Sequence, residues 1–257
     1  MIRDHAGRVA AMAGQPYLTH WGRVRAAVVW EVLTAALPTG PLVVVDAGGG
    51  SGGFGVPLAR LGHRVTVVDP SPDALASLER RAAEEGADGA VTGIQGDLDT
   101  LLDVVPAGAA DLVLCHSVLE VVDDPARGLA AASAALKPGG LASVLTANRT
   151  AAVLSRALGG HFDDAAAALD DPAGRWGAAD GTRRRFGLDE LLALVAGAGL
   201  TDPEVHGVRI FTDLVAGGVL DADPAGFEAL VRLEVAAAAR PPYRDIATQL
   251  HVLARHP

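Results

Sequence analysis

The chain has 257 residues, of which 50% are hydrophobic and 20% are charged, a composition typical of a globular protein and unlike that of disordered or fibrous chains. Its formal net charge of −10 argues against general attraction to nucleic acid or to anionic membranes. The single cysteine, Cys115, excludes an internal disulfide, and we interpret it as a core residue in a reducing compartment.

The apolar runs, such as 42–45 and 112–115, are far too short to cross a bilayer, and the N-terminus lacks the layout of a signal peptide. We therefore expect a cytoplasmic protein. An α/β chain of this length commonly forms one domain with a full core, so we expect a single domain over residues 1–257.

Short β-branched runs alternate along the chain with Ala- and Leu-rich helical patterns, which is typical of βα units around a parallel sheet. The expected strands are 42–46, 64–69, 90–94, 110–115, 140–147, 205–211 and 247–254. The expected helices are 24–36, 55–61, 72–86, 124–136, 187–199 and 223–239. The predicted fold class is α/β, with a seven-stranded, mostly parallel sheet, an antiparallel last strand and helices on both faces.

Several boundaries have a local cause. Ser71 precedes Pro72, and Asp123 and Asp124 precede Pro125, so we expect an N-cap at Ser71 and another at Asp123 or Asp124, each with the proline in the first helical turn. The segment 137–140, Lys-Pro-Gly-Gly, is expected to end a helix and turn the chain into the fifth strand. Residues 150–186 break the rhythm and are expected to form an insertion with one or two short helices, and residues 1–24 a lid.

A glycine-rich loop follows the first expected strand, over residues 46–53. Gly48, Gly50 and Gly53 satisfy the G-x-G-x-x-G spacing, in which glycines allow a sharp turn and close approach of a ligand to the backbone. Asp69 ends the second strand, where a carboxylate can accept hydrogen bonds from an adenosine ribose. These residues alone fit both a dinucleotide and another adenosyl cofactor.

Further motifs decide between these cofactors. They are Asp46 two residues before the first glycine, Gly96-Asp97 after the third strand, Asp111-Leu-Val-Leu-Cys-His116 in the fourth and Leu136-Lys-Pro-Gly-Gly140 before the fifth. With these motifs in this order, the chain resembles the class I S-adenosylmethionine-dependent methyltransferases. The resemblance implies a Rossmann-like fold and S-adenosyl-L-methionine as cofactor. We prefer this interpretation to the alternative of an NAD-dependent oxidoreductase or a non-catalytic nucleotide-binding protein.

Other motifs narrow the resemblance and extend it over nearly the whole chain. They are Tyr17-x-x-x-x-Gly22-x-x-Arg25, His116-Ser-Val-Leu-Glu120, Asn148, Gly207-Val-Arg-Ile-Phe211 with Asp213, Leu233-Glu234, Pro242-Tyr243 and His251-Val-x-Ala-Arg255. Together they are similar to the tRNA 5-carboxymethoxyuridine carboxyl-methyltransferase family.

The resemblance implies roles for matching positions in this chain. For the cofactor, Arg25 and Asp46 would lie at its methionine part, Gly48, Gly49 and Gly50 at its amino acid end, Asp69 at the ribose, Gly96, Asp97 and Leu98 at the adenine, and His116 along the pocket wall. For the substrate, the candidates are Tyr17, Arg209 and Tyr243.

The acceptor determines whether a base is needed. A carboxylate is already ionised at neutral pH and needs only positioning, for example by Arg209, whereas a hydroxyl or amine must lose a proton to His116, Glu120 or His161. Arg209 could instead pair with Asp213 or Glu204. The histidines lack paired ligand spacing, so we expect no metal site. We predict methyl transfer to a small molecule, with tRNA as the alternative substrate.

Overall fold

The computed structural model describes residues 19–215 and 223–257, so Tyr17 and most of the expected lid segment 1–24 lie outside the described residues. The helices are α2 (His20–Ala36), α3 (Gly55–Arg60), α4 (Pro72–Glu84), α5 (Leu101–Val104), α6 (Pro125–Ala134), α7 (Arg149–Leu158), α8 (Phe162–Asp170), α9 (Leu188–Gly197), α11 (Pro224–Ala237) and the 3-10 helices η1 (Thr212–Leu214) and η2 (Tyr243–Ile246). The strands are β1 (Val43–Ala47), β2 (Arg64–Asp69), β3 (Val91–Gln95), β4 (Ala110–His116), β5 (Leu136–Ala147), β6 (Thr201–Val208) and β7 (Gln249–Arg255).

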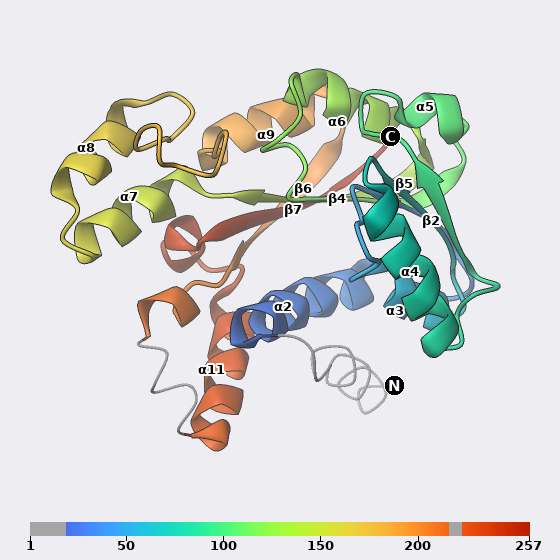
Figure 1. Ribbon diagram of the computed structural model, residues 1–257, viewed down its shortest axis with the longest axis horizontal. Coiled ribbons are helices and arrows are strands. Elements are labelled where there is room, and N and C mark those ends of the chain that lie inside the picture. The colour runs from blue at the N-terminus through green and yellow to red at the C-terminus, as the bar shows by residue number, and fades with distance from the viewer. Residues whose placement is uncertain (1–18, 216–222) are drawn as a thin grey trace. The chain divides into compact units, whose positions relative to one another are not determined.

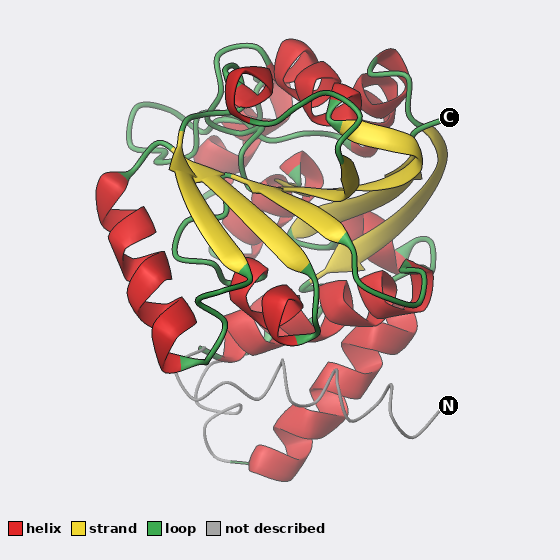
Figure 2. Ribbon diagram, turned by 90° about the vertical axis from the view of Figure 1, so that its right-hand side faces the viewer, coloured by secondary structure: helices red, strands yellow, loops and turns green. Residues whose placement is uncertain are grey.

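The strands form a seven-stranded sheet in the order β3-β2-β1-β4-β5-β7-β6, whose twist is visible in Figure 2. Each neighbouring pair from β3 to β5 is parallel. Strand β7 runs opposite to β5, because the Gly139 amide bonds the His256 carbonyl near one end and the Asn148 amide bonds the Thr248 carbonyl at the other. The predicted α/β class, with a mostly parallel sheet and an antiparallel last strand, is confirmed.

The chain divides into two compact units, each built from three segments. Unit 1 contains residues 1–38, 147–188 and 205–251, and unit 2 contains residues 39–146, 189–204 and 252–257. In unit 2 the chain passes outward from β1 to β2 and β3 in one direction and returns to β4 and β5 in the other. The carboxyl ends of β1 and β4 therefore flank the point where the strand order reverses, which is where open α/β sheets bind ligands.

The strands of unit 2 are continuous apolar runs in the sequence because they lie in the core of the unit. Val44, Val65, Leu112 and Leu114 are fully buried, because helices cover the strands that carry them. Helices α3 and α4 lie against β2 and β3, as Figure 1 shows. The loops that leave the carboxyl ends of these strands are thus supported by a packed layer of helix and sheet.

Unit 1 contains paired helices. Helix α2 contacts α11, where Val24 and Phe227 share a buried cluster, and α7 contacts α8 (Figure 1). Helices α7 and α8 fall within the expected insertion 150–186, which was predicted to hold one or two short helices. Within the described residues, no helix is long and apolar enough to cross a membrane.

Both predicted N-caps are confirmed, and one predicted turn is wrong. Ser71 accepts a hydrogen bond from the Ala74 amide, and Asp124 accepts from the amides that follow Pro125. The segment 137–140 is not a turn before β5, because β5 begins at Leu136 and contains it. Ala110 pairs with Leu136 and Leu112 with Leu141, so the four residues 137–140 of β5 lie opposite the single residue Asp111 of β4 and form a bulge.

Candidate cofactor site

The loop between β1 and α3 has a conformation that requires glycine. Gly48 has a φ of +71°, and a Cβ atom on it would lie 2.3 Å from Val118 Cγ2. A Cβ atom on Gly49 would lie 2.5 Å from the buried carboxylate of Asp46. Gly50 also has a positive φ, but there a Cβ atom would meet only Asp69 Oδ2, at 4.0 Å. The loop is thus packed tightly against the protein at its start and open to a ligand at Gly50.

Asp69 connects three segments at the end of β2. The side chain is buried, and its Oδ2 accepts a hydrogen bond from the Gly50 amide at 2.9 Å. Its Oδ1 accepts from the Ser71 amide, also at 2.9 Å, at the start of α4. The Asp69 carbonyl accepts from the Gly96 amide at 3.3 Å. Each carboxylate oxygen accepts one of these hydrogen bonds and keeps a second lone pair, so the group can still accept from hydroxyl groups.

The segment that follows β3 is held by its own side chains. Asp97 Oδ1 accepts from the Thr100 hydroxyl at 2.8 Å and from the Thr100 amide at 2.9 Å. These two hydrogen bonds lower the pKa of Asp97. Leu98 is buried next to it. The turn 96–100 therefore has a fixed shape beside Asp69, and the Asp97 carboxylate stays ionised at neutral pH.

His116 lies at the carboxyl end of β4, also buried. Its Nε2 is 2.8 Å from the Ser143 hydroxyl on β5, and its ring meets the edge of Phe54 with 4.9 Å between ring centroids. Burial, and then the charges of Glu120 and Asp46, raise the pKa of Cys115, the residue before His116. Cys115 therefore remains a neutral thiol, in agreement with its predicted role as a core residue.

Unit 2 brings together most of the predicted cofactor residues at the carboxyl ends of β1 to β4. They are Asp46, Gly48, Gly49, Gly50, Asp69, Gly96, Asp97, Leu98 and His116. Their chemistry fits an adenosyl cofactor: a backbone loop open at Gly50, a carboxylate with unused acceptor capacity and an apolar side chain at Leu98. Arg25, on α2, belongs to unit 1, so its predicted contact with the cofactor stays a prediction.

The predicted substrate residues belong to unit 1 or lie outside the described residues. Arg209 follows β6 with a φ of +62°, and its Nη2 contacts both carboxylate oxygens of Asp213, at 2.7 and 2.6 Å. The pairing with Asp213 that the sequence left open is therefore present. Tyr243 is 48% exposed, and its ring centroid lies 6.0 Å from that of Phe211.

Other candidates differ in their environment. Among the possible bases, Glu120 is buried, whereas His161 is exposed at the start of α8. Within residues 19–215 and 223–257, no group of three or more His, Cys, Asp or Glu side chains is arranged to hold a metal ion. Glu234 was not predicted to bind anything, yet it is fully buried and accepts four hydrogen bonds from residues 210–212.

Comparison with known proteins agrees with this arrangement. Residues 45–144, which contain the loop, Asp69 and His116, match the family model described as a methyltransferase domain. The chain is also 25% identical to an S-adenosylmethionine-dependent methyltransferase from Mesorhizobium loti, over 90% of this chain and 99% of that one, with a TM-score of 0.60. These similarities show that the protein is an S-adenosylmethionine-dependent methyltransferase. The cofactor of this methyltransferase is S-adenosylmethionine, as predicted.

Two relatives of the methyltransferase differ in substrate. It is 29% identical to the tRNA 5-carboxymethoxyuridine methyltransferase of Escherichia coli (strain K12), over 94% of this chain and 91% of the relative. It is 40% identical to a ubiquinone biosynthesis O-methyltransferase of Methylobacterium sp. (strain 4-46), over 44% of each chain. The first relative extends the predicted resemblance over both units, whereas the second matches less than half of the chain.

Proposed function

We propose that this methyltransferase binds its cofactor in unit 2 and transfers the methyl group to a small-molecule acceptor. The observation that carries the placement is the junction at Asp69, whose carboxylate accepts from Gly50 and whose carbonyl accepts from Gly96. Through this junction the glycine loop and the turn after β3 meet at one residue, the loop at its carboxylate and the turn at its carbonyl. Ribose hydroxyls would donate to Asp69, and adenine would lie along Gly96, Asp97 and Leu98.

The remaining cofactor contacts follow from charge and position. The backbone of Gly48, Gly49 and Gly50 would hold the amino acid end, and the negative charge of Asp46 would stabilise the cationic methionine part. His116, fixed by Ser143, would form a wall of the pocket. Arg25 would bind the carboxylate of the methionine part.

When bound, S-adenosylmethionine supplies a methyl group that its sulfonium already activates. The residues of the chain then need to align the acceptor and exclude water. For a carboxylate acceptor, Arg209 and Tyr243 would orient the anion and no base is required. For a hydroxyl or amine acceptor, the buried side chains of His116 and Glu120 are the candidates to accept the proton.

A small-molecule acceptor is favoured over RNA by charge. Contacts to phosphates supply much of the affinity of proteins for nucleic acid, and a net charge of −10 opposes such binding. The second candidate function is methylation of 5-carboxymethoxyuridine in tRNA, which the near full-length similarity to the Escherichia coli relative favours. We further propose that the chain forms a single domain and acts in the cytoplasm, without a membrane partner.

Transfer of radiolabelled methyl groups separates these candidates. The purified protein is incubated with labelled cofactor and with one of three acceptor sets: a collection of small carboxylic acids, phenols and amines, the free nucleoside 5-carboxymethoxyuridine, or tRNA containing that nucleoside. We expect label in small molecules and little in tRNA. Efficient labelling of the tRNA with no labelling of any small molecule would establish the second candidate instead.

A further inference from the structure

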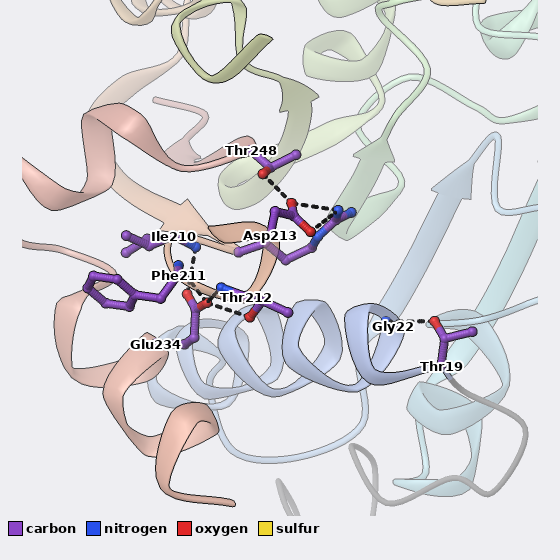
Figure 3. Close-up of polar contacts among 9 residues, drawn as sticks. Thr19, Gly22, Ile210, Phe211, Thr212, Asp213, Glu234 and Thr248 are labelled. Carbon is purple, nitrogen blue, oxygen red and sulfur yellow. Dashed lines mark hydrogen bonds and ion pairs between the residues drawn. The ribbon is translucent and has the colours of Figure 1, made fainter. Parts of the chain in front are cut away.

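The Glu234 carboxylate binds the backbone amides of a turn at residues 210–212. From α11, its Oε2 accepts from the Ile210 amide at 2.7 Å, and its Oε1 accepts from the amides of Phe211 and Thr212 at 2.9 and 2.8 Å. The Thr212 hydroxyl donates to the same oxygen at 2.6 Å. Figure 3 shows the carboxylate directed into the turn. All four donors are neutral, so a fully buried charge is stabilised here by backbone dipoles and a hydroxyl group.

The turn that Glu234 holds begins at Arg209. Arg209 has a left-handed φ of +62°, which residues other than glycine, asparagine and aspartate rarely adopt. Its carbonyl accepts from the Thr248 amide at 3.0 Å. The amides of the next three residues, 210–212, all donate to the Glu234 carboxylate. The surroundings therefore fix both sides of an unusual backbone conformation, as is common at functional sites.

Asp213 fixes the guanidinium group of Arg209. Its carboxylate contacts Arg209 Nη2 through both oxygens, and the Thr248 hydroxyl donates to its Oδ2 (Figure 3). The Nε atom of Arg209 is buried and has no hydrogen-bond partner among the described residues. The guanidinium group thus has a set orientation and N–H donors that Asp213 does not use.

We propose that Glu234 and Asp213 are positioning residues that orient Arg209 to bind a carboxylate of the acceptor. Glu234 fixes the backbone of Arg209 and Asp213 fixes its guanidinium group, so little conformational entropy is lost when an anion binds. This inference rests on the proposed methyl transfer and names the class of acceptor as a carboxylic acid. Neither acid needs to contact the acceptor itself.

The positioning is testable without turnover. The 15N-labelled protein is studied as wild type, Glu234→Gln, Asp213→Asn and Glu228→Gln; Glu228 is the matched control, because it lies on the same helix but is exposed and pairs with Arg23. The Arg209 Nε–H resonance is assigned by its loss in Arg209→Lys. We expect amide exchange at 210 and 212 to accelerate at least tenfold in Glu234→Gln, and the Arg209 resonance to shift in Glu234→Gln and Asp213→Asn but not in Glu228→Gln.

Thr212→Val provides a milder change if Glu234→Gln does not fold. It removes one of the four donors to Glu234 and should give a smaller acceleration of the same amides. Unchanged exchange and an unchanged Arg209 resonance in both variants would overturn the positioning role of Glu234. An unshifted resonance in Asp213→Asn would overturn that of Asp213.

Binding of the anion is tested on the protein saturated with S-adenosylhomocysteine. The carboxylate probe is 5-carboxymethoxyuridine, and its methyl ester is the neutral control. We expect the acid but not the ester to shift the Arg209 resonance, with affinity lowered at least tenfold in Glu234→Gln. Equal shifts by acid and ester, or no shift by either, would overturn the inference. A protein that fails to bind S-adenosylhomocysteine would contradict the proposed function, whereas the exchange measurements would still decide the positioning roles.

Discussion

Replacing Asp69 tests the proposed cofactor site at its centre. In the Asp69→Ala variant the ribose loses its carboxylate, while the Gly50 and Ser71 amides lose the oxygens that accept from them at 2.9 Å. Hydrogen bonds to a charged group contribute about 1.5–3 kcal/mol. Because about 1.4 kcal/mol corresponds to a tenfold change in affinity, losing one such bond weakens cofactor binding between about 10-fold and about 150-fold.

Two further variants separate loss of charge from loss of loop structure. Asp69→Asn keeps an oxygen that can accept from the Gly50 amide, so we expect its affinity to lie between those of wild type and Asp69→Ala. Asp73→Ala is the matched control, because Asp73 is an exposed acid in the first turn of α4, four residues away. We expect Asp73→Ala to bind the cofactor as wild type does.

Isothermal titration calorimetry with S-adenosylhomocysteine measures these affinities, and thermal unfolding shows whether each variant is folded. An Asp69→Ala variant that is folded and binds S-adenosylhomocysteine within twofold of wild type would refute the reasoning. The ribose would then have to lie away from the end of β2.

Three other predictions follow from the described contacts. Gly48→Ala should lower the free energy of unfolding by about 1–2 kcal/mol and weaken cofactor binding, because Ala at a φ of +71° is strained and its Cβ meets Val118. A Cβ at Gly53 would lie in open space, so Gly53→Ala should change stability and binding little. Equal urea midpoints for the two variants would contradict this prediction. Asp180→Asn should lower the free energy of unfolding, measured in urea at pH 7, by about 3 kcal/mol, because it breaks a buried ion pair with Arg185 at 2.7 Å. A decrease below about 1 kcal/mol would show that the ion pair is dispensable. Burial, then the charges of His206 and Arg25, lower the pKa of His251 to about 3, so folding favours its neutral form. The contribution of this group to the free energy of unfolding should be fully present above its unfolded pKa of about 6.5. It should fall by up to about 1.4 kcal/mol per pH unit as the pH is lowered towards 3. His251→Leu should flatten this slope in urea titrations, and an equal slope would assign it to other groups.

The strands, and the position of the candidate residues at their carboxyl ends, could be predicted because their causes are local. Val43, Val44 and Val45 form an apolar run that ends at an acid and a series of glycines, which predicts a buried strand followed by a tight loop. The N-caps at Ser71 and Asp124 are set by the residue and the proline after it. Since parallel strands end at the same edge, Asp46, Asp69 and His116 all lie at the carboxyl edge of the sheet.

The features that sequence reasoning missed depend on contacts between distant residues. The segment 137–140 has the composition of a turn, but Lys137 Nζ contacts Asp111 Oδ1 on β4 at 2.8 Å, and the segment joins the sheet as a bulge. Glu234 lies 22 to 24 residues from the amides that it binds, so the local pattern of α11 contains no signal for that role. Helix α5 is a single turn, too short for a periodic pattern.

A crystal structure of the protein with S-adenosylhomocysteine is the most direct measurement of where the cofactor binds. We expect the ribose hydroxyls within hydrogen-bond distance of the Asp69 carboxylate and the amino acid end against Gly48, Gly49 and Gly50. Density for the ligand at any other place, with Asp69 still bonded only to Gly50 and Ser71, would contradict the account.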